Sequence, residues 1–559
     1  MSTENSALNG TAQTLRPSHV QGMSAQEIVE YLKHRGFNVD IARGSATVTG
    51  ITMDSRQVQS GDLYVALPGA KAHGGQFIGA AVSAGAVAVL TDSAGVAMLG
   101  EHAQQLAVIQ CEELRAAVGP LSAEIYGSQP QDGSAPTLLA LTGTNGKTTT
   151  TYMVNSLMEQ LGHTTGLIGT IEILAGGAAI PSRLTTPEST HVHSLLSLMR
   201  EQGISSMSME VSSHALDYRR VDGVRYDVAG FTNLTQDHLD QHGTMENYCA
   251  SKAALFTPER SRRAVITADD EWGEKMLGQA IGAMGIENVV ALFTHHGAGF
   301  IQAPHDLADQ DWALIDVRPE GIGHTFSVVR GDGVRLDSST QLPADFNVSN
   351  AALAAVMVYE SGANQQRLAE ILAEKSGITP VVPGRMQLIS TEPTALVDFA
   401  HNPDALQRAL QALHSAGQDS KVIVVFGATG ERDQTKRPIM GDIAARFADI
   451  VIVTDDDPHD EPADPIRDEV CAGAIKAQKE GARVREILNI SPRADAISRA
   501  IELAGPHDAI LVAGRGHEVA QEVSGVNHDL DDRVEVARAL LEHDYDVLEA
   551  YRLTAKEAK

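Results

Sequence analysis

The sequence predicts an α/β protein, and two observations carry this prediction. Short apolar runs of strand length alternate with helical stretches along most of the chain, as at residues 62–67, 86–90 and 450–454. Such alternation indicates parallel sheets joined by right-handed helical crossovers. The length of 559 residues corresponds, at about 150 residues per domain, to roughly three or four domains.

The composition excludes several classes of protein. The chain has 43 basic and 72 acidic residues, a net charge of −29, so we expect neither a nucleic-acid nor a membrane partner. The three cysteines, Cys111, Cys249 and Cys471, form no C-x-x-C pair, which excludes a disulfide framework and a cysteine-type zinc site. The first fifteen residues lack an apolar segment, so we expect no signal peptide and a cytoplasmic location. We also expect a monomer.

Domain boundaries follow from shifts in pattern. Residues 1–21 are polar and are expected to form a flexible tail. A small α/β domain is predicted at 22–134, where it ends in a stretch rich in Gly, Ser and Pro. A central domain is predicted at 135–381, and a C-terminal domain, in which strands and helices alternate again, at 382–559.

A phosphate-binding loop is the most specific motif. The predicted strand 137–141 is followed by T-G-T-N-G-K-T-T-T and then by a helix. Glycines allow backbone N–H groups to surround phosphate oxygens at a helix N-terminus. Lys147 is placed to reach the β and γ phosphates, and the Thr148 hydroxyl to bind Mg²⁺. The candidate ATP-binding residues of this loop are Gly143, Thr144, Asn145, Gly146, Lys147, Thr148 and Thr149.

Two further candidates, Glu210 and His238, follow predicted strands of the same domain. The carboxyl ends of parallel strands meet at one edge of a sheet, which is where ligands bind in such folds. A carboxylate and an imidazole at that edge can hold Mg²⁺ together with nucleotide oxygens. Either residue alone would be interpreted as a capping or surface residue, but beside the phosphate loop both are predicted metal ligands.

These motifs resemble the Mur ligase family, whose members join amino acids to cell-wall precursors. The phosphate loop, M-D-S-R at 53–56, M-E-V-S-S-H at 209–214 and Y-C-A-S-K-A-A-L-F at 248–256 occur in the family's order. The resemblance extends from about residue 53 to 533. It implies a UDP-binding N-terminal α/β domain, a central ATP-binding domain with a P-loop ATPase-like parallel sheet, and a Rossmann-like C-terminal domain that binds the amino acid.

The resemblance also implies roles that the bare patterns leave open. Catalysis would involve Lys147, Glu210, His238 and Lys252. Thr148, Glu210 and His238 would bind Mg²⁺, and Lys252, modified to a carbamate, would bind a second Mg²⁺, because carbamylation turns a cation into an anion. Asn347 and Arg385 would contact ATP, with Ala344 standing where the family has glycine. The implied contacts of the UDP-MurNAc-dipeptide are Ser55, Thr185, Thr186, Ser212 and Arg220.

Three segments at predicted strand ends of the C-terminal domain resemble the family's pocket for the incoming amino acid. Members that add meso-diaminopimelate carry D-N-P-R, whose arginine binds the second carboxylate of that substrate. This chain has D-D-P-H at 456–459 within an acidic loop. Histidine cannot fork onto a carboxylate, and the acids suit an ammonium side chain. The candidate amino-acid-binding residues are Arg432, Asp456, Asp457, His459, Gly514 and Glu518.

The implied activity is an ATP-dependent ligase with two Mg²⁺ ions. It would add a basic amino acid, L-lysine in preference to ornithine, to the D-Glu of UDP-MurNAc-L-Ala-D-Glu through an acyl phosphate, in peptidoglycan synthesis. One alternative is a ligase like folylpolyglutamate synthetase, which shares the architecture and the phosphate loop. Another is the same reaction with meso-diaminopimelate. A P-loop GTPase is disfavoured because the chain has no guanine-reading N-K-x-D.

Overall fold

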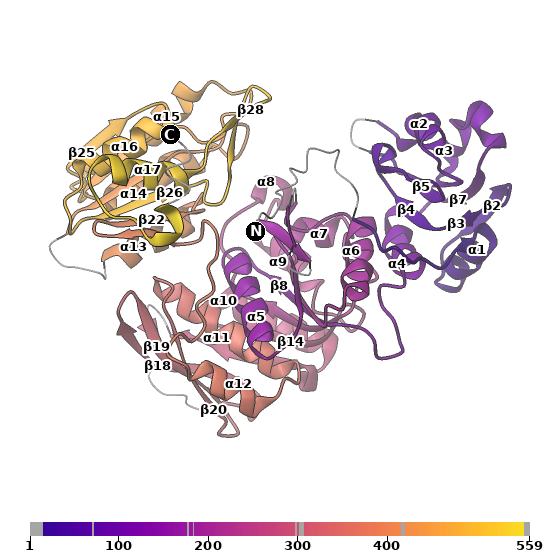
Figure 1. Cartoon of the computed structure of the whole chain (residues 1–559), viewed down its shortest axis with the longest axis horizontal. Coiled ribbons are helices and arrows are strands. Elements are labelled where there is room, and N and C mark those ends of the chain that lie inside the picture. Colours follow the sequence, from indigo (N-terminus) through magenta and orange to yellow (C-terminus); the bar gives the residue numbers. More distant parts are fainter. Residues whose placement is uncertain are drawn as a thin grey trace, which may run out of the picture.

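The computed structural model describes residues 15–69, 72–175, 178–182, 184–296, 299–300, 307–414 and 420–552. Three α/β units follow one another along the chain, and the central unit lies between the other two (Figure 1). Each unit has its own sheet. The predicted α/β class and the three-part architecture are confirmed. Within the described ranges, no helix is both long and apolar enough to cross a membrane.

The N-terminal unit has a five-stranded sheet of order β2-β7-β6-β5-β4. Its inner strands β5 and β6 are fully buried, as expected for parallel strands covered on both faces, and β2 is the antiparallel edge strand. The elements are β1 (Met23–Ser24), α1 (Ala25–His34), β2 (Val39–Arg43), β3 (Thr47–Val48), β4 (Gly50–Thr52), β5 (Asp62–Ala66), α2 (Ile78–Ser83), β6 (Ala88–Thr91), α3 (Ser93–Ala97), β7 (Ala107–Cys111) and α4 (Leu114–Tyr126).

The predicted flexible tail is described only in part. Residues 1–14 lie outside the described residues. Residues 15–19 contact both neighbouring units: Arg16 pairs with Asp62 of β5, and the backbone amides of Ser18 and His19 donate to the carboxylate of Glu201. This part of the predicted tail is therefore held against the fold.

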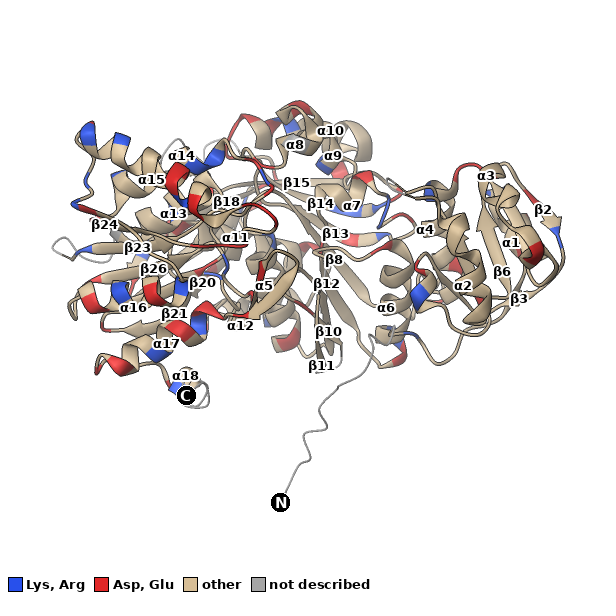
Figure 2. Ribbon diagram, turned by 90° about the horizontal axis from the view of Figure 1, so that it is seen from above, with Lys and Arg blue, Asp and Glu red and all other residues tan. Residues whose placement is uncertain are grey.

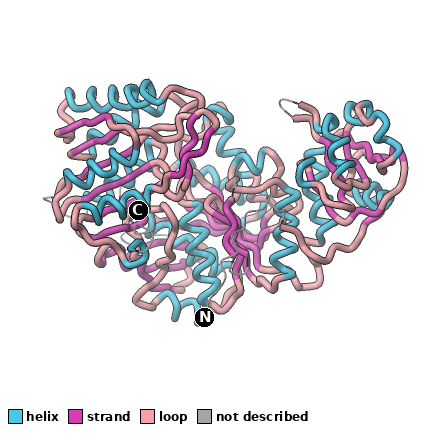
Figure 3. Tube along the Cα trace, turned by 45° about the horizontal axis from the view of Figure 1, so that its top comes forward, coloured by secondary structure: helices cyan, strands magenta, loops and turns pink. Residues whose placement is uncertain are grey.

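The central unit has an eleven-stranded sheet of order β11-β10-β9-β12-β8-β13-β14-β15-β18-β19-β20. The strands from β9 to β18 in this order run parallel, and antiparallel strands extend the sheet at both ends. Along β8, Leu138 and Ala140 pack into one core cluster while Leu139 and Leu141 pack into another. Both faces are thus covered by helices (Figure 3), which explains why β8 is apolar without alternation.

The first half of the central unit holds most of the predicted chemistry. Its elements are β8 (Thr137–Thr142), α5 (Lys147–Gln160), β9 (Thr165–Ile168), β10 (Glu172–Ala175), β11 (Ala178–Pro181), α6 (Ser189–Glu201), β12 (Ser206–Glu210), α7 (Ser213–Asp217), β13 (Tyr226–Phe231), α8 (Leu239–His242) and α9 (Met245–Ala253). The second half completes the sheet with β14 (Ser261–Thr267), α10 (Glu271–Met284), β15 (Val289–Phe293), β16 (His295–His296), β17 (Gly299–Phe300), β18 (Trp312–Glu320), β19 (Gly323–Arg330), β20 (Arg335–Thr340), α11 (Asp345–Glu360) and α12 (Gln365–Leu372).

The C-terminal unit has a six-stranded sheet of order β21-β22-β26-β23-β24-β25, in which β21 alone is antiparallel to its neighbour. The carboxyl ends of its five parallel strands therefore meet at one edge. The elements are β21 (Gln387–Thr391), β22 (Thr394–Asp398), α13 (Pro403–His414), β23 (Val422–Phe426), α14 (Lys436–Phe447), β24 (Ile450–Val453), α15 (Ala463–Lys479), β25 (Glu486–Asn489), α16 (Arg493–Leu503), β26 (Ala509–Ala513), β27 (Ala520–Val523), β28 (Val526–Asp529), α17 (Asp532–Glu542) and α18 (Glu549–Arg552).

Candidate active site

The phosphate loop joins the carboxyl end of β8 to the first turn of α5. Gly143 and Gly146 both have positive φ, 147° and 87°. A Cβ at Gly143 would lie 1.9 Å from Thr232 Oγ1, and one at Gly146 would lie 2.5 Å from Asn350 Oδ1, so only glycine fits either position. Lys147 Nζ donates to the carbonyls of Gly143 and Thr144, at 3.1 and 2.9 Å. The loop is thus folded around its own lysine. Among the described residues, no side chain caps the N-terminus of α5, so its backbone N–H groups favour an anion.

Glu210 lies at the end of β12, next to β8, and is completely buried. Its carboxylate accepts hydrogen bonds from Thr148 Oγ1 at 2.9 Å, from the Thr170 backbone N–H at 2.8 Å and from Thr170 Oγ1 at 3.0 Å. Thr170 is a functional candidate that the sequence analysis missed. The available signal was its position just after β9, a third strand that ends at this edge.

His238 lines the same pocket as Glu210 and Lys147. Burial lowers the pKa of its imidazole to about 4, so the ring is neutral and offers a lone pair. Its Nε2 lies 3.7 Å from Asp237 Oδ2. Within the described part of the chain, no group of three or more His, Cys, Asp or Glu side chains is arranged to hold a metal ion. A hydroxyl, a carboxylate and a neutral imidazole fit a Mg²⁺ whose other ligands are nucleotide phosphates and water.

Lys252 lies in the last turn of α9 and is 1% exposed. The helix α9 begins at Met245 and ends at Ala253. Lys252 Nζ donates to the Gly143 carbonyl at 2.7 Å and lies 4.4 Å from the centroid of the Tyr248 ring. Burial, reinforced by the charge of Lys147, lowers the pKa of Lys252 well below its ordinary value. An amine of lowered pKa is nucleophilic at neutral pH, so the site fits the predicted carbamylation.

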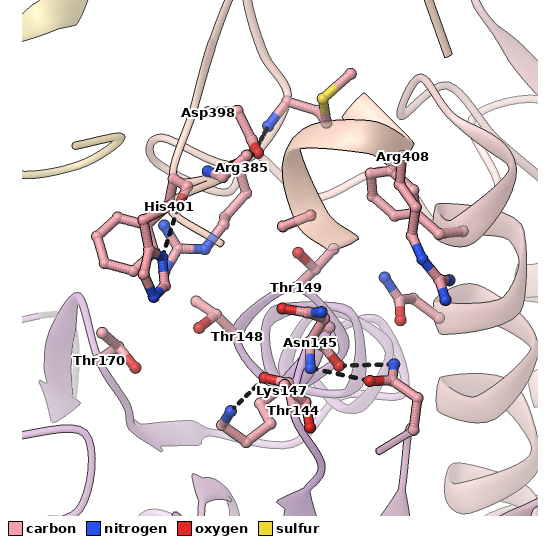
Figure 4. A pocket seen from close by; sticks show the side chains of 18 of the residues that line it. Thr144, Asn145, Lys147, Thr148, Thr149, Thr170, Arg385, Asp398, His401 and Arg408 are labelled. Atoms are coloured by element: carbon pink, nitrogen blue, oxygen red, sulfur yellow. Dashed lines mark hydrogen bonds between the residues drawn. The ribbon is translucent and has the colours of Figure 1, made fainter. Parts of the chain in front are cut away.

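The C-terminal unit closes the pocket from the other side. Figure 4 shows Arg385 and His401 facing Thr148 and Thr149 across it. The two units also touch directly, because Asn145 Nδ2 of the phosphate loop donates to Asp404 Oδ2 at 2.9 Å. The predicted ATP-binding residues that line this pocket are Thr144, Asn145, Gly146, Lys147, Thr148, Thr149, Asn347 and Arg385. Gly143 lies beneath it, where its carbonyl accepts from both Lys147 and Lys252.

Asn347 enters the pocket from the first turn of α11. Its Nδ2 donates to the Pro343 carbonyl at 2.7 Å, and its Oδ1 accepts from Asn350 Nδ2 at 3.1 Å. Ala344, just before this helix, has φ of 83°. That conformation favours glycine, which accounts for the glycine of the family pattern at this position.

A second cavity lies between the N-terminal sheet and α6. Ser55, one of the predicted substrate residues, lines it together with Glu188. Thr185 lines the ATP pocket instead, so the segment 185–188 runs from one cavity to the other. The other predicted substrate residues support this segment: Thr186 Oγ1 donates to the Glu210 carbonyl and accepts from the Ser212 N–H, and Arg220 Nε donates to Glu188 Oε1 at 2.9 Å.

The predicted amino-acid pocket gathers at the edge of the C-terminal sheet. A Cβ at Gly514 would lie 2.7 Å from Asp456 Oδ2, and Arg515 Nη1 lies 3.8 Å from Glu518 Oε2. His459 Nδ1 lies 2.8 Å from Glu522 Oε2. Arg432 is exposed, on a loop whose Gly430 N–H donates to the Asp457 carbonyl.

The structure corrects the expectation of an acidic loop whose charge is open to an ammonium group. Asp455 pairs with Arg467, Asp457 with Arg515, and Glu461 with Arg437. Each of these arginines is at most one-tenth exposed. The negative charge of the loop is therefore largely neutralised within the fold, and the loop alone is a weaker argument for a basic amino acid.

The Glu518 carboxyl leads us to predict that the KM for the amino acid depends on pH. Burial, reinforced by Asp456, raises the pKa of its carboxyl to about 8. The ionised form, which can pair with an ammonium group, is therefore gained as the pH rises through about 8. We expect the KM for the amino acid to fall across this range in the wild type and to fall less in Glu518→Gln. This KM is measured from initial rates at a series of pH values. An equal dependence of KM on pH in the two proteins would contradict the prediction. The KM for ATP is the control and should change equally in both.

Known proteins are similar to this chain over most of its length. The chain matches three family models: the catalytic domain of the Mur ligase family at residues 47–124, the Mur ligase middle domain at 141–358, and the Mur ligase glutamate ligase domain at 384–516. A solved structure of UDP-N-acetylmuramoyl-L-alanyl-D-glutamate--2,6-diaminopimelate ligase superposes with a TM-score of 0.62 at 28% identity, covering 94% of this chain and 100% of that chain.

Two curated relatives are similar over almost the whole chain. The UDP-N-acetylmuramoyl-L-alanyl-D-glutamate--2,6-diaminopimelate ligase of Corynebacterium glutamicum is 39% identical over 90% of this chain and 93% of its own. The UDP-N-acetylmuramyl-tripeptide synthetase of Leifsonia xyli subsp. xyli is 39% identical over 94% and 98%. The first name specifies diaminopimelate rather than lysine, so the relatives support the alternative amino acid better than the expected one.

Proposed function

The chain belongs to the Mur ligase family as an ATP-dependent ligase that adds the third residue to UDP-MurNAc-L-Ala-D-Glu, and we propose how its residues do so and which amino acid it takes. The observation that carries the mechanism is the pocket in which Lys147, Thr148 and Glu210 face Arg385 and His401 of the C-terminal unit.

ATP occupies this pocket, with its γ-phosphate between Lys147 and Arg385. The D-Glu carboxylate reaches it along the segment 185–188, which links the two cavities. The carboxylate oxygen attacks the γ-phosphorus, ADP leaves, and an acyl phosphate forms. Lys147 and Arg385 stabilise the charge on the transferred group. Mg²⁺ held at Thr148, Glu210 and His238, and a second ion at carbamylated Lys252, would neutralise phosphate charge.

The amine of the amino acid then attacks the acyl carbon, and phosphate leaves. The edge of the C-terminal sheet supplies the pocket for this amino acid, with Glu518 and Asp456 as partners for its ammonium group. Contact between Asn145 and Asp404 across the two units supports an arrangement in which both substrates are held close together.

Two amino acids are candidates. The names of the relatives support meso-diaminopimelate, and the internal pairing of the acidic loop removes much of the argument against it. L-Lysine is the second candidate, because His459 stands where the family pattern for diaminopimelate has arginine. Ornithine is grouped with lysine. The two differ by one methylene, which changes the free energy of discrimination in kcat/KM by only ~1–3 kcal/mol.

The His459→Arg variant tests the specificity loop directly. His459 is partly exposed, so there is room for a longer side chain. Its φ of 52° is no less favourable for arginine than for histidine, so the variant should fold. A guanidinium at this position can fork onto a second carboxylate. We expect the ratio of kcat/KM for meso-diaminopimelate to that for L-lysine to rise by about tenfold, or ~1.4 kcal/mol. Initial rates with both amino acids measure the ratio, and an unchanged ratio would show that residue 459 does not touch the substrate.

The proposed activity is tested by release of phosphate and formation of UDP-MurNAc-tripeptide with purified protein. Both must require ATP, UDP-MurNAc-L-Ala-D-Glu and an amino acid together. Higher kcat/KM for meso-diaminopimelate supports the first candidate, and higher kcat/KM for lysine or ornithine supports the second. Ligation of glutamate to a folate, with no tripeptide formed, would refute the assignment.

A further inference from the structure

Residues 15–19 bridge the N-terminal and central units, and we call them the strap. At one end, the Leu15 carbonyl accepts from Ser194 Oγ of α6 at 2.8 Å. At the other end, Glu201 of the same helix accepts from the Ser18 and His19 backbone amides at 2.8 and 2.9 Å. These hydrogen bonds lower the pKa of the Glu201 carboxyl to about 2. The strap is thus bound along the second half of α6, from Ser194 to Glu201.

Arg16 fastens the strap to the N-terminal unit. Its Nη2 donates to Asp62 Oδ2 at 2.8 Å, and Asp62 is 1% exposed. A Cβ at Gly50 would lie 2.5 Å from Arg16 Nη1. Because Gly50 of β4 has no side chain, the guanidinium of Arg16 fits beside it. Arg16 and Asp62 therefore form a largely buried pair between the strap and the sheet.

The strap also contacts the 3₁₀ turn Ser55–Gln57, which belongs to the M-D-S-R motif region. Arg16 Nη2 donates to the Gln57 carbonyl at 3.4 Å. The Gln57 side chain in turn lies 2.6 Å from His191 Nε2 of α6. The turn therefore has hydrogen bonds to both the strap and α6. Helix α6 packs beside α4 of the N-terminal unit (Figure 2).

The strap reaches the second cavity itself. Leu15 lines this cavity together with Ser55, Gln57 and His191. We propose that the strap completes the site for the nucleoside diphosphate sugar, with Leu15 as part of the wall and Arg16 as a positioning residue that fixes the turn Ser55–Gln57. This inference rests on the proposed function, since it takes the second cavity as the site of the UDP-sugar.

Three variants test the strap: Leu15→Ala, Arg16→Ala and Glu201→Ala. Glu201 is partly exposed, so its removal leaves no buried charge, whereas Arg16→Ala leaves Asp62 unpaired and can fail to fold. We expect the KM for UDP-MurNAc-L-Ala-D-Glu to rise by roughly five- to tenfold in each folded variant, with kcat and the KM for ATP within about twofold of wild type. Glu159→Ala, an exposed glutamate near the end of α5, is the matched control and should leave all three constants unchanged.

Equilibrium binding of UDP-MurNAc provides a second readout that does not depend on turnover. Weaker binding in Leu15→Ala and Glu201→Ala, with the melting temperatures of both variants unchanged and wild-type binding in Glu159→Ala, would support the role of the strap. Unchanged binding and KM in both variants would overturn it. If the wild type forms no tripeptide, the proposed function fails, and UDP-MurNAc binding still decides the role of the strap.

Discussion

Replacing Lys147 with alanine is expected to lower kcat by more than about 10³-fold, or ~4 kcal/mol of barrier, because a preorganised charge is lost where the phosphoryl group develops negative charge. The fold should persist, since the hydrogen bonds of Lys147 Nζ go to the carbonyls of Gly143 and Thr144 in its own loop. Phosphate release and a thermal melt, measured side by side, separate the two effects.

Lys479→Ala is the matched control for this variant. Lys479 is exposed at the end of α15, outside the ATP pocket, and its loss should leave the rate unchanged. If Lys147→Ala keeps more than about a tenth of the wild-type rate, which is ~1.4 kcal/mol of barrier or less, the assigned role of Lys147 is wrong.

Replacing Lys252 with alanine is expected to leave almost no activity, and added short carboxylates should restore part of it. The reason is that the carbamate would supply an anion for the second Mg²⁺, and a free carboxylate can take that place. Lys252 is buried against the Gly143 carbonyl and the Tyr248 ring, so alanine leaves a small space in which a short acid fits. Initial rates with and without acetate measure the rescue.

Lys252→Arg separates the carbamate from a simple positive charge. A guanidinium stays cationic and cannot ligate Mg²⁺. We therefore expect this variant to be as inactive as Lys252→Ala in the same phosphate-release assay. Wild-type rates in Lys252→Arg would rule out the carbamate.

Much of the fold and of the ATP site was predictable because it is encoded locally. The order of strand, glycine turn and helix around Lys147 is a continuous stretch, and its structure follows directly. Glu210 was predictable as the last residue of a strand, and His238 as part of the loop that follows another strand, since parallel strands end at one edge. Their assignment to the same pocket as Arg385 depended on the family resemblance, because the two units are far apart in sequence.

The missed features depend on partners that are distant in sequence. Thr170 contacts Glu210 because β12 pairs with β9, and strand order cannot be read from the sequence. The acidic loop looked unpaired because Arg515, the partner of Asp457, lies 58 residues away.

The most direct test of the proposed acyl-phosphate mechanism is oxygen transfer. UDP-MurNAc-L-Ala-D-Glu labelled with ¹⁸O in the γ-carboxylate of D-Glu is converted to tripeptide, and the released phosphate is examined by mass spectrometry. The attacking carboxylate oxygen becomes the bridging oxygen of the acyl phosphate and leaves with phosphorus when the amine attacks the carbon. One ¹⁸O per phosphate is the predicted result. Unlabelled phosphate accompanying labelled tripeptide would contradict the mechanism.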